Sequence, residues 1–446
     1  YVIYFNQEIR KYSEILTCHG EAYLFHTFHD ESTLDVKAYY FYSERGLPGA
    51  VILYNPKAEE RLWDENFFTQ ARYKKTFSPK WTLQAQAKFN HSWNKYEDTD
   101  VKYENGKQTD INRQDEYYLS AAVLYQPVKG LELSLAQDGF INTLHTNIND
   151  SPNPVRYSSL TALNARYQWG RIKLSGTLVG TFITEEVKAG NTPDDRKRLS
   201  PTLSVSIQPW KEEQLYVRAM YKNTFRVPTF NDLYYLRIGN TSLRPEKARE
   251  YNIGVTWNGK PFSFTDFLSI TLDGYYNEVT DKIVAFPSTY VWKMQNYGTV
   301  HITGLDATMA TSIPVCPNIN VGLSGNYSWQ KAIDMTNPDA KNYKDQLPYT
   351  PQHSGNASTT IETPWINVGY SLTGGSERYY MAQNIPVNKI DGYVEHTATL
   401  WREFTMKGCH LRLQAEVINL TDKQYDVIKY SPMPGRSWRI TGVLRF

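Results

Sequence analysis

Apolar and polar residues alternate along most of this 446-residue chain. In one run, Trp81, Leu83 and Phe89 interleave with Gln84 and Lys88. Comparable runs occupy residues 250–257, 319–330 and 411–417. A period of two predicts β-strands that have one apolar and one polar face. Several runs exceed about nine residues, the length of a tilted strand that crosses a membrane, whereas soluble strands average about five or six.

The expected connections between these strands alternate in length. Short turns are expected near residues 78–80, 128–130, 168–170, 210–212, 258–260, 315–317, 363–365 and 407–408. Long polar loops are expected at about residues 95–115, 143–157, 185–198, 223–247, 279–297, 331–352, 376–391 and 421–436. Short turns at one end and long loops at the other are typical of bacterial outer-membrane barrels. Five tryptophans lie near the short turns, where an interfacial aromatic girdle is expected: Trp81, Trp169, Trp210, Trp257 and Trp365.

The polar faces of the strands carry Lys, Arg, Gln and Glu. We expect them to face a water-filled lumen, because a small barrel fills its interior with apolar side chains. Counting back from the C-terminus gives about nineteen or twenty strands, the earliest near residues 1–8, 15–28 and 33–43. The pattern therefore predicts an all-β fold, a large antiparallel transmembrane β-barrel domain that occupies residues 1–446, with Phe446 closing the sheet against an N-terminal strand.

The amino-acid composition agrees with a transmembrane β-barrel but would not by itself predict one. Aromatic residues make up 14% of the chain, with 34 Tyr and 11 Trp, and the mean hydropathy is −0.55. No apolar stretch reaches the ~18 residues that a membrane-spanning helix needs. A soluble all-β protein would have a similar composition, so the strand lengths and the alternating connections decide between the two. The net charge of +2 gives no reason to expect a nucleic-acid partner.

The sequence carries no sign of catalytic or metal chemistry. It contains no phosphate-binding loop, G-x-S-x-G elbow or H-E-x-x-H motif, so we expect neither an enzyme nor a cofactor. Cys18, Cys316 and Cys409 are far apart, and the nine histidines are scattered without metal-ligand spacing. The acidic pairs at 98/100 and 194/195 supply too few oxygens for calcium. Outer-membrane proteases and phospholipases are smaller barrels than this chain would form.

Three segments resemble one known family. NTFRVPTFNDLY at 223–234 followed by GNTSLRPE at 239–246 resembles the FR-x-P…LY…PE box of TonB-dependent transporters. YYNEVTDKI at 275–283, with NYG at 296–298, is similar to the next barrel strands of that family. VINLTDKQY at 417–425, continuing to Phe446, resembles its closing hairpin. The resemblance implies a 22-stranded barrel around an N-terminal plug. No plug-like segment occurs here, so the chain is expected to lack the plug and the first strands.

The resemblance also implies a function. TonB-dependent transporters import scarce, bulky nutrients through the outer membrane, with capture by extracellular loops and plug movement powered by TonB. YSERGLPGA at 42–50 and IGNTSLRPE at 238–246 are most similar to cobalamin transporters of the Bacteroidetes type, which implies cobalamin or a related corrinoid as cargo. A ferric siderophore is the alternative, and a passive porin a more remote one. No His lies between Arg226 and Pro245, which counts against haem. Implied partners are TonB, outer-membrane lipid and a surface lipoprotein.

Ligand contacts are expected from aromatic and basic residues on the long loops and the upper lumen wall, because conjugated ligands stack on aromatic faces. The candidates are Tyr234, Tyr235, Arg237, Tyr290, Trp292, Tyr349, Arg378, Tyr379, Tyr380 and Tyr430. The alternative for each tyrosine is a place in the outer interfacial belt. Arg226, Pro228 and Glu246 are expected to be structural, with the arginine and the glutamate forming a pair.

Overall fold

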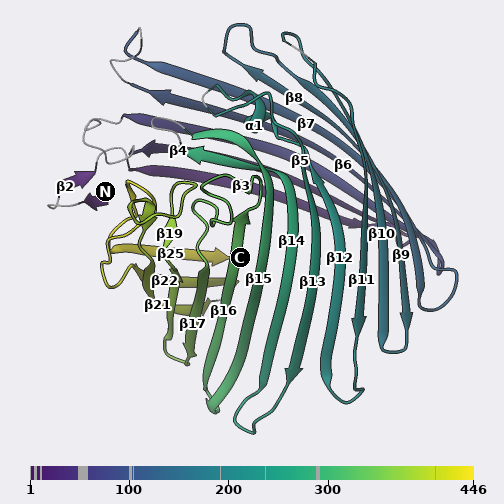
Figure 1. Ribbon diagram of the computed structural model, residues 1–446. Coiled ribbons are helices and arrows are strands. Elements are labelled where there is room, and N and C mark those ends of the chain that lie inside the picture. The colour runs from purple at the N-terminus through teal and green to yellow at the C-terminus, as the bar shows by residue number, and fades with distance from the viewer. Residues whose placement is uncertain are drawn as a thin grey trace.

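One large antiparallel sheet makes up most of the computed structural model (Figure 1). The structure describes residues 2–4, 8–10, 13–48, 59–99, 103, 105–190, 192–236, 238–287, 292–406 and 408–446. Within them, nineteen strands belong to this sheet: β3 (Ile15–Thr27), β4 (Thr33–Leu47), β5 (Glu60–Ser78), β6 (Trp81–Asp98), β7 (Gln108–Tyr125), β8 (Leu131–Thr146), β9 (Val155–Trp169), β10 (Ile172–Glu186), β11 (Arg196–Ile207), β12 (Gln214–Arg226), β13 (Glu246–Gly259), β14 (Phe267–Pro287), β15 (Trp292–Cys316), β16 (Ile319–Asp334), β17 (His353–Glu362), β18 (Asn367–Gly375), β21 (Tyr393–Met406), β22 (Cys409–Ile418) and β25 (Ser437–Arg445).

Smaller elements lie outside this sheet. Three two-stranded pairs are formed by β1 (Val2–Tyr4) with β2 (Glu8–Arg10), β19 (Arg378–Tyr379) with β20 (Lys389–Ile390), and β23 (Asp426–Ile428) with β24 (Ser431–Pro432). The helices of the described residues are α1 (Phe230–Tyr234) and a 3₁₀ turn, η1 (Pro386–Asn388). No helix in the described part of the chain is long and apolar enough to span a membrane.

The strands are ordered as they follow one another in the sequence. Along this order, from β3 to β25, each strand pairs antiparallel with the next strand of the sheet. The long strands curve together around a common axis (Figure 1). Every residue of β3 and most residues of β25 are exposed.

Strand prediction was right for most of the chain and wrong in two places. The strands expected near 15–28 and 33–43 are β3 and β4. The first expected strand, 1–8, is wrong as a strand of the large sheet, because β1 pairs with β2 in a separate hairpin. The loop expected at 279–297 is also wrong, since β14 runs on to Pro287 and β15 begins at Trp292. Polar side chains suggested a loop there, but the backbone ladder continues, with Ile283 opposite Asn296.

Alternate residues of the strands form the two faces that the sequence predicts. One face exposes large apolar side chains, among them Leu119, Leu163 and Ile253. Four of the five predicted girdle tryptophans are also exposed near the short turns: Trp81, Trp169, Trp210 and Trp365. The other face is mostly polar. We call the first the outer face and the second the inner face.

Buried apolar residues gather where loops fold onto the long-loop end of the inner face. One cluster joins Ala248, Val279, Val300 and Ala332 of β13–β16 to Leu347 of the β16–β17 loop. A second cluster joins Leu233, Leu243 and Ile283. These small cores hold two loops against the wall and so position the residues of the candidate site.

Candidate functional site

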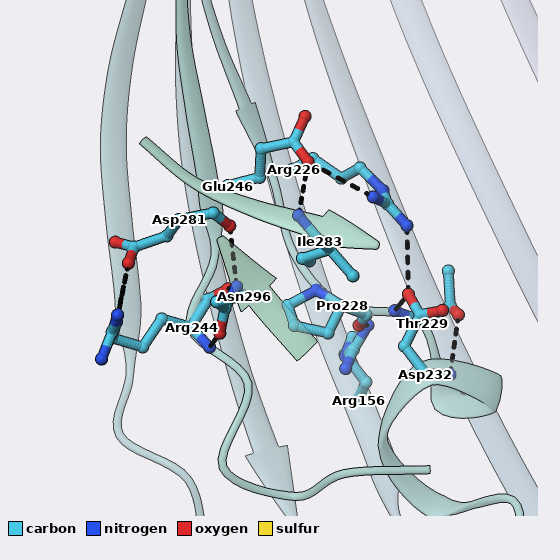
Figure 2. Close-up of polar contacts among 10 residues, drawn as sticks. All are labelled: Arg156, Arg226, Pro228, Thr229, Asp232, Arg244, Glu246, Asp281, Ile283 and Asn296. Atoms are coloured by element: carbon cyan, nitrogen blue, oxygen red, sulfur yellow. Dashed lines mark hydrogen bonds and ion pairs between the residues drawn. The ribbon is translucent and has the colours of Figure 1, made fainter. Parts of the chain in front are cut away.

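The connection between β12 and β13, residues 227–245, begins with α1, whose N-terminus is capped by hydrogen bonds (Figure 2). Thr229 caps α1: its hydroxyl accepts from the Asp232 backbone N–H at 3.2 Å, and its own N–H donates to Asp232 Oδ2 at 2.9 Å. This reciprocal capping box satisfies two amides that a helix start leaves free. Asp232 Oδ2 also accepts from Arg226 Nη2 at 3.1 Å, so the last residue of β12 orients the helix.

The two ends of this connection meet at Arg226 and Glu246 (Figure 2). Arg226 Nη1 lies 3.6 Å from Glu246 Oε2, which confirms the predicted pair. The same carboxylate oxygen accepts from the Ile283 backbone N–H at 2.9 Å. Glu246 therefore joins β12, β13 and β14 at the point where the connection leaves the sheet.

The far part of the connection is bound to the β14–β15 hairpin (Figure 2). Arg244 donates to Asp281 Oδ1 through Nε at 2.8 Å and Nη2 at 2.6 Å. Asn296 accepts from the Arg244 backbone N–H at 2.8 Å and donates to the Asp281 carbonyl at 2.7 Å. The Met294 N–H donates to the Ile238 carbonyl at 2.9 Å. The hairpin that was expected to be a loop is thus the support for this segment.

The α1 part of the connection reaches β9 and β10. Glu185 is 1% exposed and accepts from Arg156 at 2.8 Å, from Arg196 at 3.4 Å and from the Tyr234 hydroxyl. Arg156 also donates to the Pro228 carbonyl at 2.9 Å. Two guanidinium groups and a phenol offset the cost of burying this carboxylate. Burial, with the Glu185 hydrogen bond second, raises the pKa of Tyr234.

Tyr235 extends the connection further, to β6 and β7. Its hydroxyl accepts from Asn94 Nδ2 and from Gln114 Nε2, both at 3.0 Å. Gln114 Nε2 also donates to Asn231 Oδ1 at 2.7 Å. Burial raises the pKa of the Tyr235 phenol. Because β6 is six positions from β12 in the strand order, residues 227–245 cross the inner face, and we call them the crossing connection.

A second group of candidate residues lies on three loops near the C-terminus. Arg378 is 3% exposed and donates through Nη2 to the carbonyls of Asp426, at 2.6 Å, and Val427, at 3.0 Å. Its Nη1 donates to the Ser376 carbonyl at 3.4 Å. Burial lowers the pKa of this guanidinium. Arg378 therefore ties the β18–β21 loop to the β22–β25 loop and is structural in this position.

Tyrosines of these loops surround a lysine. Lys429 Nζ lies 5.8 Å from the ring centroid of Tyr380 and 5.3 Å from that of Tyr430, both within cation–π range. Tyr349 lies beside them, and its N–H donates to the Tyr379 carbonyl at 2.7 Å. Tyr430 is 46% exposed. We call Tyr349, Tyr380, Tyr430 and Lys429 the tyrosine cluster.

The predicted site residues that the structure describes therefore fall into two separate groups. Tyr349, Tyr379, Tyr380 and Tyr430 come together, whereas Tyr234 and Tyr235 are bound to the inner wall. Arg237 and Tyr290 lie outside the described residues. Trp292 is the first residue of β15, and the structure does not describe its side chain.

Sequence reasoning missed Lys429 and the wall residues. Lys429 could have been found as the cation next to the predicted Tyr430. Asn94 and Gln114 gave no signal, because they lie 141 and 121 residues from Tyr235 in the sequence. Among the described residues, no group of three or more His, Cys, Asp or Glu is arranged to hold a metal ion.

Comparison with protein families gives one match that spans most of the chain. A family model described as "TonB dependent receptor-like, beta-barrel" matches residues 20–420.

Two curated proteins are similar over part of the sequence. The vitamin B12 transporter BtuB of Vibrio vulnificus is 32% identical over 84 residues, which are 18% of this chain and 13% of that protein. The vitamin B12 transporter BtuB of Photobacterium profundum is 29% identical over 240 residues, which are 52% of this chain and 36% of that protein. The matched regions thus span well under half the length of these relatives.

Solved structures share the fold. The siderophore receptor PiuA from Acinetobacter baumannii has a TM-score of 0.74 at 12% identity, over 97% of this chain and 74% of that one. The copper transporter OprC has a TM-score of 0.74 at 17% identity, over 97% of this chain and 72% of that one. At these identities the likeness concerns the fold alone.

Proposed function

Because the chain belongs to the TonB-dependent receptor-like β-barrel family, we propose that it imports a bulky nutrient, cobalamin or a related corrinoid. Members of this family are outer-membrane receptors rather than enzymes, and the chain lies in the outer membrane. The observation that carries the proposal is the tyrosine cluster, formed where three long loops meet at one end of the family barrel.

The choice of cargo rests on sequence similarity. The two curated relatives described above are named vitamin B12 transporters, and the longer of these two matches covers 52% of this chain. The second candidate is a ferric siderophore, favoured by fold neighbours such as the siderophore receptor PiuA. Sequence identity is more than twice as high for the former relatives, 29% against 12%, so we place corrinoids first.

The chemistry of the tyrosine cluster supports capture of such a ligand. A corrin is a large conjugated ring system that can stack on aromatic faces, and phenol hydroxyls can hydrogen-bond its amide side chains. Lys429 supplies a positive charge beside two of the rings. Arg378 holds two of the contributing loops together, which reduces the entropy lost when the ligand orders them.

Passage inward requires more than capture. We propose that the sheet closes between β25 and β3, that the lumen works with a plug, and that TonB supplies the energy. The crossing connection lies over the inner face and would have to shift, or leave a path beside it, as the cargo moves. A surface lipoprotein that delivers the cargo is a further proposed partner.

Titration calorimetry of the full-length protein tests the cargo and the cluster together. We expect tight binding of cyanocobalamin, weaker or no binding of a panel of ferric siderophores, and at least about tenfold weaker binding in Tyr430→Ala, since one stacked aromatic contributes about 0.5–1.5 kcal/mol beyond its buried area. Tyr343→Ala is the matched control, because Tyr343 lies in the β16–β17 loop but contacts Lys344, with 5.2 Å from Nζ to the ring centroid, and is not a member of the tyrosine cluster. Binding of a siderophore alone, or equal effects of both substitutions, would contradict the proposal.

A further inference from the structure

The β23–β24 hairpin, in the loop between β22 and β25, carries Lys429 at its tip. Lys429 and Tyr430 form the turn between the two short strands. The Tyr430 N–H donates to Asp426 Oδ2 at 3.1 Å, and a hydrogen bond joins the Lys429 backbone to the Tyr349 hydroxyl. Arg378 donates to two carbonyls of the same hairpin. The turn is therefore held by residues of two neighbouring loops, which fixes the position from which the lysine side chain extends.

Two tyrosines of the tyrosine cluster have a left-handed backbone. The angle φ is 57° at Tyr349 and 64° at Tyr430, and no other aromatic residue in the described part of the chain has a positive φ. This region of backbone conformation favours glycine and is strained for a bulky side chain. Strained residues of this kind gather at ligand-binding sites, where the surrounding structure holds them in place. The cluster thus keeps a phenol at two positions where glycine would suit the backbone better, which indicates that the phenols themselves are used.

The tyrosine cluster has an excess of positive charge. Within the described residues, no ion pair joins Lys429 or Arg378 to a carboxylate. Arg378 donates to backbone carbonyls instead. Of the carboxylates on these loops, Asp426 accepts from a backbone N–H, and Glu377 pairs with Lys389. Two cations therefore lie at the cluster without a paired anion, and Lys429, which is only partly buried, is the one that a ligand can reach.

An ammonium between phenol rings fits a ligand that combines a conjugated ring with an anionic group. Lys429 Nζ lies 5.8 Å from the Tyr380 ring centroid and 5.3 Å from that of Tyr430, so a group bonded to it also meets the rings. The amide side chains of a corrinoid are neutral, and its negative group is the phosphate ester of the nucleotide side chain. We propose, on the basis of the proposed corrinoid import, that Lys429 makes the tyrosine cluster selective for corrinoids that carry this phosphate. Arg378, which is 3% exposed, adds positive charge from beneath without contacting the ligand.

Calorimetric titration of the full-length protein with two matched corrinoids tests this selectivity. Cobinamide and cobinamide phosphate, both with cyanide on cobalt, are the probes because they differ only in the phosphate. We expect cobinamide phosphate to bind at least about tenfold more tightly, the effect of one hydrogen bond to a charged group. Lys429→Gln should lower the affinity for cobinamide phosphate to that for cobinamide and leave cobinamide binding unchanged. Inorganic phosphate alone should not bind, because it makes no contact with the rings.

Two further variants separate the charge of Lys429 from general damage to the loops. Lys429→Arg keeps the charge and should keep the preference for phosphate. Lys344→Gln removes a lysine with a similar ring contact outside the cluster, 5.2 Å from Nζ to the Tyr343 ring centroid, and should keep it too.

The outcomes distinguish the selectivity from the import itself. Equal binding of the two probes, a preference that survives Lys429→Gln, or binding of inorganic phosphate alone would overturn the selectivity and leave corrinoid import in place. Binding of cyanocobalamin with neither probe would do the same. Failure of cyanocobalamin to bind would overturn the proposed function, and the phosphate selectivity with it.

Discussion

Arg226 and Glu246 face each other where the crossing connection leaves and re-enters the sheet, with 3.6 Å between Arg226 Nη1 and Glu246 Oε2. The arginine side chain is 46% exposed, so solvent weakens the ion pair itself. The stronger constraint is the bond from the buried Ile283 N–H to the same carboxylate, at 2.9 Å. Glu246 therefore anchors the crossing connection mainly by accepting the hydrogen bond of the Ile283 backbone N–H, and less through its ion pair with Arg226.

Glu246→Ala is expected to loosen the crossing connection, because it leaves the Ile283 N–H without its acceptor at a cost of about 1–3 kcal/mol. Hydrogen exchange of residues 227–245 in the purified protein measures this effect. Glu246→Gln should exchange more slowly than Glu246→Ala, since an amide oxygen can still accept. Glu278→Ala is the control, because its pair with Arg249, at 3.7 Å, is exposed. Equal exchange in all three variants would contradict this role.

Arg378 is expected to resist replacement by lysine. Its planar guanidinium reaches carbonyls of Ser376, Asp426 and Val427 at once, which an ammonium cannot do. Arg378→Lys should therefore lower cyanocobalamin affinity at least about tenfold by releasing two loops, a loss of about 1.4 kcal/mol. Calorimetry measures the affinity, and Arg402→Lys, on β21 beside Phe404, is the control. Unchanged affinity in Arg378→Lys would show that the loops do not need this tie.

A short reducible cross-link between positions 114 and 231 is expected to lock the crossing connection to the wall, because Gln114 Nε2 and Asn231 Oδ1 meet at 2.7 Å. Side chains that meet at their tips hold their β-carbons farther apart than a direct disulfide allows, so the double variant Gln114→Cys/Asn231→Cys would be joined by a short bis-methanethiosulfonate. The background requires serine in place of the free Cys18, Cys316 and Cys409. If the connection shifts during import, the cross-linked protein should bind cargo normally but import it several-fold more slowly. Reduction should restore import, whereas full import by the cross-linked protein would mean that the connection stays in place.

Alkaline pH is expected to release α1 from β10. Burial and Glu185 raise the pKa of Tyr234 above its usual value of about 10. A raised pKa means that the folded protein holds this proton more tightly than the unfolded chain. The stabilisation is therefore complete below pH ~10 and is lost as the pH rises further. Hydrogen exchange at α1, corrected for its base-catalysed intrinsic rate, should show constant protection from pH 8 to ~10 and falling protection from pH ~10 to 12. The same profile in Tyr234→Phe would assign it to another group.

The alternation of apolar and polar residues predicted the strands of the large sheet better than the connections between them. Period-two alternation is a local property, so strands such as β6 and β16 could be located from their own residues. The β14–β15 hairpin was missed because polar residues such as Asp281 and Asn296 hold it through contacts with Arg244, which no local pattern reveals.

The candidate site shows the same limit. Tyr349 and Tyr430 could be proposed from residue type alone, since exposed loop tyrosines suit a conjugated ligand. The attachment of Tyr235 to Asn94 and Gln114 depends on how the sheet brings β6 and β7 beneath a loop from β12. Burial of Leu347 against β13–β16 likewise follows from loop folding and not from its own segment.

Uptake of labelled cyanocobalamin by cells tests the central claim most directly. Cells that lack this protein would be complemented with the unsubstituted gene or with the Tyr430→Ala form, in strains with and without TonB. Accumulation that requires both the protein and TonB, and that falls in Tyr430→Ala, is the predicted result. Equal accumulation without the protein or without TonB would contradict TonB-dependent corrinoid import.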